Sequence, residues 1–259
     1  MKNTTSSTAW PMRCILCLLV VAVAGTCVLR AQTSRVITAT DHRPLAAALD
    51  ALEKVTGVAI NYEDVPYKNE SDLEDVSTPQ QRLATPSYRL MVPRRGSVSV
   101  PLRAMESDGD RLAVLNELVS SYRRNKLPGD FKVEQANGIF YVIATRTTSE
   151  NGAIRDVVSP LSAPISVPYA ERRIIDTVAL ILAVASKPGG PRIDVGSLPF
   201  FPPTLVSFGA DREPARDALA RLFAKATARP VSYRLLFDPL LKNYMMNVQA
   251  LPESGAMTQ

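Results

Sequence analysis

The sequence predicts an α+β fold of two tandem small modules, each with two helices packed on short mixed sheets. Two observations predict this fold. First, one order of elements (strand, helix, strand, strand, helix, strand, strand) runs twice, over about 36–145 and 164–251. Second, 46% of the 259 residues are hydrophobic and 21% are charged, close to the averages of globular domains. We therefore expect a packed core in each module.

Residues 1–31 are predicted to be a secretory signal peptide. Lys2 and Arg13 precede a short apolar run over 14–24, and small residues follow it. Cleavage is expected after Ala24 or after Ala31. The apolar run is shorter than the ~20 residues that span a bilayer as a helix. The leader therefore predicts a periplasmic or secreted bacterial protein.

The cysteines agree with this interpretation. All three lie in or beside the leader, at Cys14, Cys17 and Cys27. From Val28 onward we expect no disulfide, no thiolate nucleophile and no cysteine metal site. Membrane attachment is expected only through an uncleaved leader or through acylation of Cys27.

The first module is predicted over 32–145. A strand begins at Val36, a helix runs from Pro44 to the stop signal Gly57, and a second strand covers 58–62. The helix carries apolar residues at a spacing of three and four, which gives it one apolar face. These residues are Leu45, Ala48, Leu49, Leu52 and Val55.

The segment 63–97 lacks periodicity and contains four prolines and an acidic cluster, so it is predicted to be an inserted surface loop. A partner-binding element and a solvated insertion are both open interpretations of it. Order returns with a strand over 98–102. A helix capped by Asp108 or Asp110 follows, and then a hairpin turns at Asn137-Gly138.

A linker rich in small and polar residues covers 146–163, the second module 164–251, and a tail 252–259. The second module begins with a strand at 165–167 and a helix over about 171–186, whose outer side is also apolar. Its second helix is predicted to begin at the cap Asp211, and a strand hairpin closes the module.

The first module resembles the secretin and TonB short N-terminal (STN) domain family. The resemblance rests on the segments 44–49, 56–62, 97–102, 115–119 and 138–143. Over 164–251 only the order of elements agrees. Domains of this family usually precede an outer-membrane channel or receptor barrel, whereas only eight residues follow Leu251 in this sequence. The resemblance implies contact with proteins of the cell envelope but no transport activity.

Charge and residue types argue against several function classes. The formal net charge is +5, and three of the 30 basic residues lie in the leader, so nucleic acid is not an expected partner. His42 is the single histidine and is predicted in a surface turn. No catalytic motif is present, so we expect no enzyme, no cofactor and no metal. Carboxylate pairs such as Asp108 with Asp110 are interpreted as helix caps.

The sequence therefore predicts an exported, non-enzymatic protein-interaction module of the bacterial envelope. Its partner is expected to be an envelope protein or a second copy of the chain. Two features are candidate contact points: aromatic residues in a proline-rich loop, and a strand edge flanked by arginines. These candidates are Phe200, Phe201, Arg94, Arg95, Val98 and Val100. The alternatives are a small-ligand or glycan-binding protein and, less favoured, a secreted hydrolase that uses two carboxylates.

Overall fold

The structure is a computed structural model that describes residues 35–85, 87–102, 105–186, 190–198, 201 and 205–251. These residues belong to one compact unit. The predicted signal peptide, both predicted cleavage sites and the tail lie outside the described residues. The fold is mixed α+β, as predicted. None of the described helices is both long and apolar enough to cross a membrane.

The first half of the chain contains strands, two long helices and a small substructure between β2 and β5. Its elements are β1 (Val36–Asp41), α1 (Pro44–Thr56), β2 (Ile60–Glu63), the 3-10 helix η1 (Glu70–Asp72), β3 (Leu73–Asp75), α2 (Pro79–Ala84), β4 (Met91–Pro93), β5 (Gly96–Pro101), α3 (Asp108–Arg124), β6 (Asp130–Ala136) and β7 (Ile139–Thr148).

The second half follows a short connection. Its elements are β8 (Ile154–Asp156), η2 (Pro160–Ser162), β9 (Pro164–Arg173), α4 (Ile174–Ala185), β10 (Ile193–Val195), β11 (Leu205–Pro214), α5 (Ala215–Ala226), β12 (Val231–Asp238) and β13 (Asn243–Ala250).

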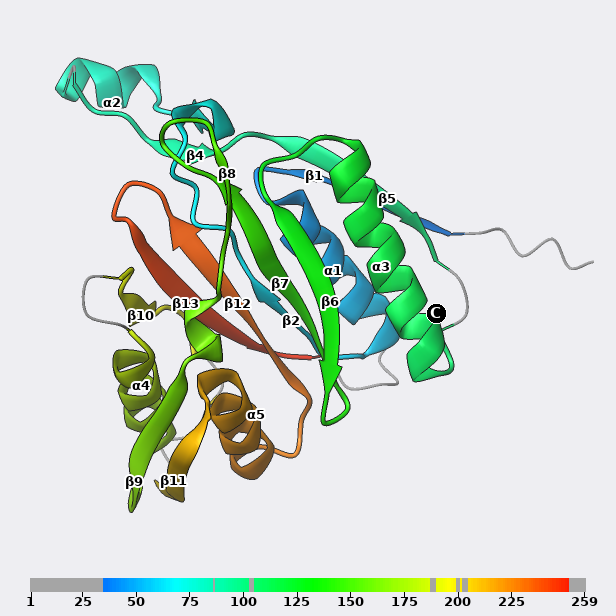
Figure 1. Cartoon of the computed structure of the whole chain (residues 1–259), viewed down its shortest axis with the longest axis vertical. Coiled ribbons are helices and arrows are strands. Elements are labelled where there is room, and N and C mark those ends of the chain that lie inside the picture. The colour runs from blue at the N-terminus through cyan, green and yellow to red at the C-terminus, as the bar shows by residue number, and fades with distance from the viewer. Residues whose placement is uncertain are drawn as a thin grey trace, which may run out of the picture. The chain divides into compact units, whose positions relative to one another are not determined.

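One sheet runs through both halves in the order β10-β13-β12-β2-β7-β6, with β8 paired to β7 (Figure 1). The strand pairing of the first half recurs in the second. β1 pairs with β5 as β9 pairs with β11, and both pairs are antiparallel. Likewise β2 runs parallel to β7, whose antiparallel partner is β6, and β10 runs parallel to β13, whose antiparallel partner is β12.

The two halves join where β12 lies parallel to β2. Charged groups that are largely buried cross this junction on both faces of the sheet. Arg234 of β12 contacts Glu53 of α1 at 2.6 Å, and Arg216 of α5 contacts Glu63 of β2 at 2.9 Å. These contacts, together with the shared backbone pairing, fix one half against the other.

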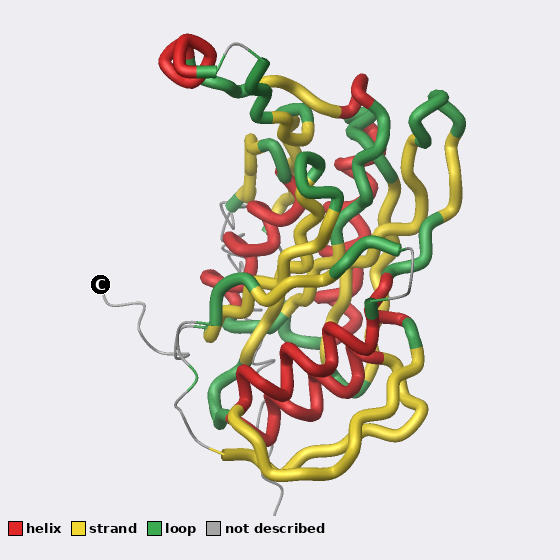
Figure 2. The backbone as a smooth tube through the Cα atoms, turned by 90° about the vertical axis from the view of Figure 1, so that its left-hand side faces the viewer, coloured by secondary structure: helices red, strands yellow, loops and turns green. Residues whose placement is uncertain are grey.

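The helices of the two halves cover opposite faces of the sheet. Tyr62 of β2 stacks on Phe131, which in turn contacts Tyr122 of α3, so this face carries α1 and α3. The neighbouring residue Glu63 points to the other face, where it meets Arg216 of α5. There α4 and α5 pack against β9 and β11, as the helix pair at the bottom of Figure 2 shows.

Several sequence predictions need correction. The cap of α3 is Ser107, whose side chain accepts from the backbone N–H of Asp110, while Asp110 occupies the third helical position of this capping box. Asp211 lies inside β11, and α5 begins only after Pro214. Strand β9 extends to Arg173, so α4 begins later than predicted.

Two segments predicted as loops contain secondary structure. The segment 63–97 holds η1, α2 and the antiparallel pair β3–β4. The predicted linker 146–163 holds the end of β7, together with β8 and η2. Apart from β7, whose end was expected in the linker, these elements have three residues each, or six in the case of α2, too few to produce a hydrophobic period.

Candidate functional site

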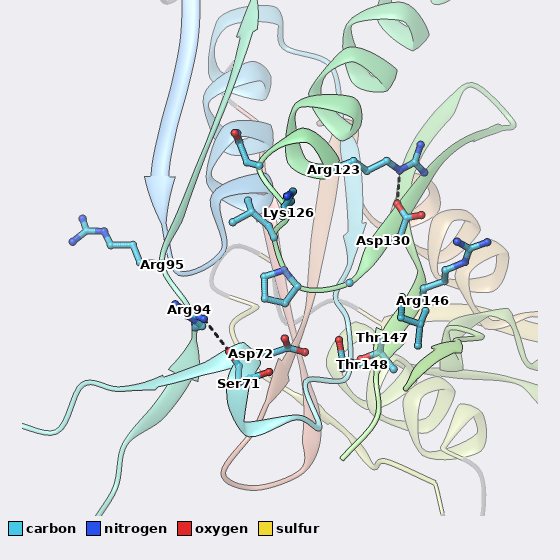
Figure 3. Close-up of a pocket in the computed structure, with 15 residues that line it drawn as sticks. Ser71, Asp72, Arg94, Arg95, Arg123, Lys126, Asp130, Arg146, Thr147 and Thr148 are labelled. Carbon is cyan, nitrogen blue, oxygen red and sulfur yellow. Dashed lines mark hydrogen bonds and ion pairs between the residues drawn. The ribbon is translucent and has the colours of Figure 1, made fainter. Parts of the chain in front are cut away.

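A cleft of about 620 Å³ opens between the segment 69–95 and the ends of α3, β6 and β7 (Figure 3). Its charged lining comes from five parts of the chain: η1, the β4–β5 connection, the end of α3, the start of β6, and β7. Most of these parts are distant in sequence, so the cleft exists only in the folded protein. Its volume is in the range of ligand pockets.

The backbone at the floor of the cleft needs left-handed conformations. After α3 ends, Lys126 has φ 51° and Gly129 has φ 85°. A Cβ atom added at Gly129 would lie 2.6 Å from Cγ2 of Val65. A residue without a side chain is therefore required here, where the turn packs against the chain that follows β2.

The cleft is strongly cationic. Its lining contains five basic side chains but only two carboxylates, Asp72 and Asp130. The basic residues are Arg94, Arg95, Arg123, Lys126 and Arg146. The whole chain has a formal net charge of +5, and an excess of three positive charges lies in this one cleft. The electrostatic potential in the cleft is therefore strongly positive.

The acidic groups engage part of this positive charge. Nε of Arg123 donates to Oδ1 of Asp130 at 2.5 Å, and Nε of Arg146 lies 3.5 Å from Oδ1 of Asp156. Burial raises the pKa of the Asp72 carboxyl above its usual value, while a hydrogen bond from Thr148 and the charge of Arg94 oppose that rise. Within the described residues, the side chains of Arg95 and Lys126 form no ion pair.

A second feature lies in the other half of the chain. A groove of about 660 Å³ runs between α4 and β10, lined by Ala179, Ala183 and Ser186 of the helix side and by 192–195 of the strand side. The outer face of α4 also exposes Ile175 and Val184, which are 45% and 44% exposed. A helix that is apolar on all sides is normally covered by another element. The apolar outer side predicted from the sequence is therefore present on α4.

The structure separates the residues predicted for partner contact. Arg94 and Arg95 both line the cationic cleft. Val98 and Val100 of β5 point into the core and are 1% and 0% exposed, so only their backbone can meet a partner strand. Phe201 stacks on Phe223 of α5 with ring centroids 5.5 Å apart. Phe200 lies outside the described residues.

His42 occupies a more specific position than a surface turn. Its Nδ1 lies 3.0 Å from the carbonyl oxygen of Pro93 and 2.8 Å from Oε1 of Glu74. The side chain therefore connects the start of α1 to the β3–β4 pair, and residues on either side of this pair line the cleft. Among the described residues, no group of three or more histidine, cysteine, aspartate or glutamate side chains is arranged to hold a metal ion.

Sequence reasoning missed most of the cleft. Nothing in the sequence distinguishes Arg123, Lys126 and Arg146 from other surface residues. They come close together only because α3 and β7 pack against the segment 69–95. The signal that was available is the Arg94-Arg95 pair beside a proline-rich acidic segment. A scan against protein-family models finds no match to the chain, and searches of curated proteins and of solved structures find none either.

Proposed function

We propose that this protein is an exported, non-enzymatic contact module of the bacterial cell envelope. In this proposal the chain consists of two tandem STN-like modules that bind a partner protein. The recurrence of one strand-pairing scheme in both halves supports the tandem arrangement. Location in the periplasm or outside the cell rests on the leader sequence alone.

The observation that carries the contact proposal is the groove beside β10, where no described strand pairs with the outer edge of β10. In the first half, α1 precedes β2, and the outer edge of β2 is covered by β12. In the second half, α4 precedes β10 in the same way, but no described strand covers the outer edge of β10. The first half therefore receives an added strand, β12, at the position that no described strand occupies in the second half.

The chemistry of the groove defines the partner segment. The site in the first half is polar, because Asp50 and Glu53 of α1 receive Arg234. The groove in the second half has Ala179 and Ala183 on its helix side, where it suits small or apolar side chains. Its strand side carries the ion pair of Arg192 with Asp194 beside Ile193 and Val195. We propose that an extended apolar segment of an envelope protein lies along β10 and over the outer face of α4.

Site-specific photo-crosslinking tests this proposal. A photoreactive residue is placed at Ala183 of the full chain in its native envelope, and a control chain carries it at the exposed Gln80 of α2. One defined protein adduct at Ala183, absent at Gln80 and lost when Ala179→Arg fills the groove, is expected. Since Ala179 is exposed, its substitution should change the unfolding free energy by no more than about 0.5 kcal/mol. Equal adducts at both positions, or none at Ala183, would overturn the proposal.

A carboxylate-dependent hydrolase has one observation in its favour. Asp72 and Asp130 line the same cleft, and the pKa of Asp72 is raised by burial, as the general acid of a glycosidase requires. Against it, Asp130 is held by Arg123 and by the backbone N–H of Phe131. Turnover of acidic or neutral glycans that disappears in Asp72→Asn would favour the hydrolase over the contact module.

A further inference from the structure

We propose that the cationic cleft binds an acidic peptide segment through its carboxylates. This site is separate from the groove beside β10, because its lining comes from 71–154 whereas that groove is formed by 179–195. The inference does not depend on strand addition, and either site can fail its test without the other.

The kind of cation favours carboxylate ligands. Four of the five basic residues in the cleft are arginines, and a guanidinium group presents parallel N–H donors that match a carboxylate. The protein's own carboxylates already use these groups: Arg123 binds Asp130, and Arg146 lies near Asp156. These two cations therefore already face carboxylates within the chain.

Part of the positive charge is left for a ligand. Within the described residues Arg95 and Lys126 form no ion pair, and both are exposed. Arg94 donates to the carbonyl oxygen of Ser71 at 3.3 Å, a long contact that leaves its other donors for a ligand. Arg146 is 58% exposed, and its separation of 3.5 Å from Asp156 is at the long end for an ion pair.

The arrangement of the cations requires a ligand with several anionic groups. Figure 3 shows Arg94, Lys126, Arg123 and Arg146 placed around the cleft on different elements, with Arg95 pointing away from the others. A single small anion cannot contact groups so distributed, whereas an extended chain of acidic residues can. The volume of about 620 Å³ accommodates several residues of such a chain.

The lining also excludes ligands that are held by stacking. No aromatic side chain is among the described residues that line the cleft. Nucleobases, and to a large extent sugar rings, are bound through stacking on aromatic faces. An acidic peptide does not need an aromatic surface, because its carboxylates and its backbone can be held by ion pairs and hydrogen bonds.

Fluorescence anisotropy with a labelled hexaglutamate peptide and the full chain tests the site at about 50 mM salt, where exposed charges are weakly screened. We expect saturable binding that weakens as salt increases, and no binding of hexaglutamine. Arg94→Glu/Lys126→Glu should weaken binding by about tenfold or more, since it reverses two of the charges that surround the cleft. The matched variant Lys54→Glu/Arg172→Glu, which makes the same change in net charge outside the cleft, should weaken it less than about twofold.

Two competing ligands distinguish a site for acidic peptides from a site for small anions or acidic glycans. Inorganic phosphate and polygalacturonate, an acidic glycan, are titrated against the bound peptide. Displacement of the peptide by millimolar phosphate, or tighter binding of polygalacturonate than of hexaglutamate, would overturn the assignment to acidic peptides. Equal loss of affinity in both double variants would also overturn it, because binding would then follow net charge and not the cleft. Circular dichroism of both variants confirms that each is folded.

Discussion

Nη2 of Arg234 in β12 lies 2.6 Å from Oε2 of Glu53 in α1, across the junction between the two halves of the chain. Both side chains are almost fully buried. Nη1 of the same guanidinium donates to the carbonyl oxygen of Ile60, and Oε1 of Glu53 accepts from the backbone N–H of Ile60. The pair therefore ties a strand of the second half to both a helix and a strand of the first.

Removing Arg234 should be strongly destabilising. Arg234→Leu leaves Glu53 buried without its cation, so the unfolding free energy should fall by about 3–5 kcal/mol. Urea denaturation measures this change. Arg192→Leu is the control, because Arg192 is 80% exposed in its pair with Asp194 and should change stability by less than about 1 kcal/mol. A loss in Arg234→Leu as small as in this control would contradict a fixed junction.

Asp64 should be as sensitive as Arg234. Its buried carboxylate accepts from the hydroxyl groups of Tyr62 and Tyr67 and from Nε of Arg43. Asp64→Ala would orphan all three donors, and a loss of about 3–5 kcal/mol in thermal or urea unfolding is expected. Asp64→Asn keeps the acceptor oxygen and should lose less. If Asp64→Asn is less stable than Asp64→Ala, the hydrogen bonds from the two tyrosine hydroxyl groups do not contribute to stability.

Two glycines with positive φ should respond differently to alanine. Gly138 has φ 75° with no atom near its missing Cβ, so Gly138→Ala meets backbone strain alone, about 1 kcal/mol. Gly129→Ala also meets Val65, and it should cost about 2–3 kcal/mol. Adding Val65→Ala to Gly129→Ala should relieve the collision but not the strain. If Gly138→Ala and Gly129→Ala lower the unfolding free energy equally, Gly129 is not closely packed against Val65.

The carboxyl of Asp72 should make stability depend on pH below neutrality. Its folded pKa is raised by burial, so the native state binds this proton more tightly than the unfolded chain, whose aspartates titrate near 3.9. The unfolding free energy of the wild type relative to Asp72→Asn should therefore increase as pH falls from 7 toward the unfolded value.

Urea titrations of both proteins at several pH values measure this difference. The comparison with Asp72→Asn cancels the contribution of other titrating groups. A relative stability that decreases on acidification would mean that the charged form of Asp72 is favoured by its surroundings.

Local signals explain which elements the sequence could predict. Pro44 and Gly57 bound α1, and Gly57 adopts the left-handed C-cap expected of it. Asn137 and Gly138 form the turn between β6 and β7, with φ of 53° and 75°. In these cases the residue type requires a particular backbone conformation, and no distant part of the chain is needed to decide it.

Contacts between distant segments explain what was missed. Arg234 and Glu53 are polar residues in a strand and a helix, and only the pairing of β12 with β2 makes them partners. The pair β3–β4 is too short to show alternation, and it is joined to α1 through His42 and Glu74. The cationic cleft depends on this placement, so its residues could be noticed in the sequence only as the isolated pair Arg94-Arg95.

The strand order β10-β13-β12-β2-β7-β6 gives the central sheet two unlike ends. Copies that met through β10 of one and β6 of the next would leave a new β10 and a new β6 outermost, so growth would continue into a ring or a fibre instead of stopping at a pair. The β6 end carries a feature that opposes such growth, because Lys132 of this strand is exposed. Charged edge strands are typical of proteins protected against runaway polymerisation.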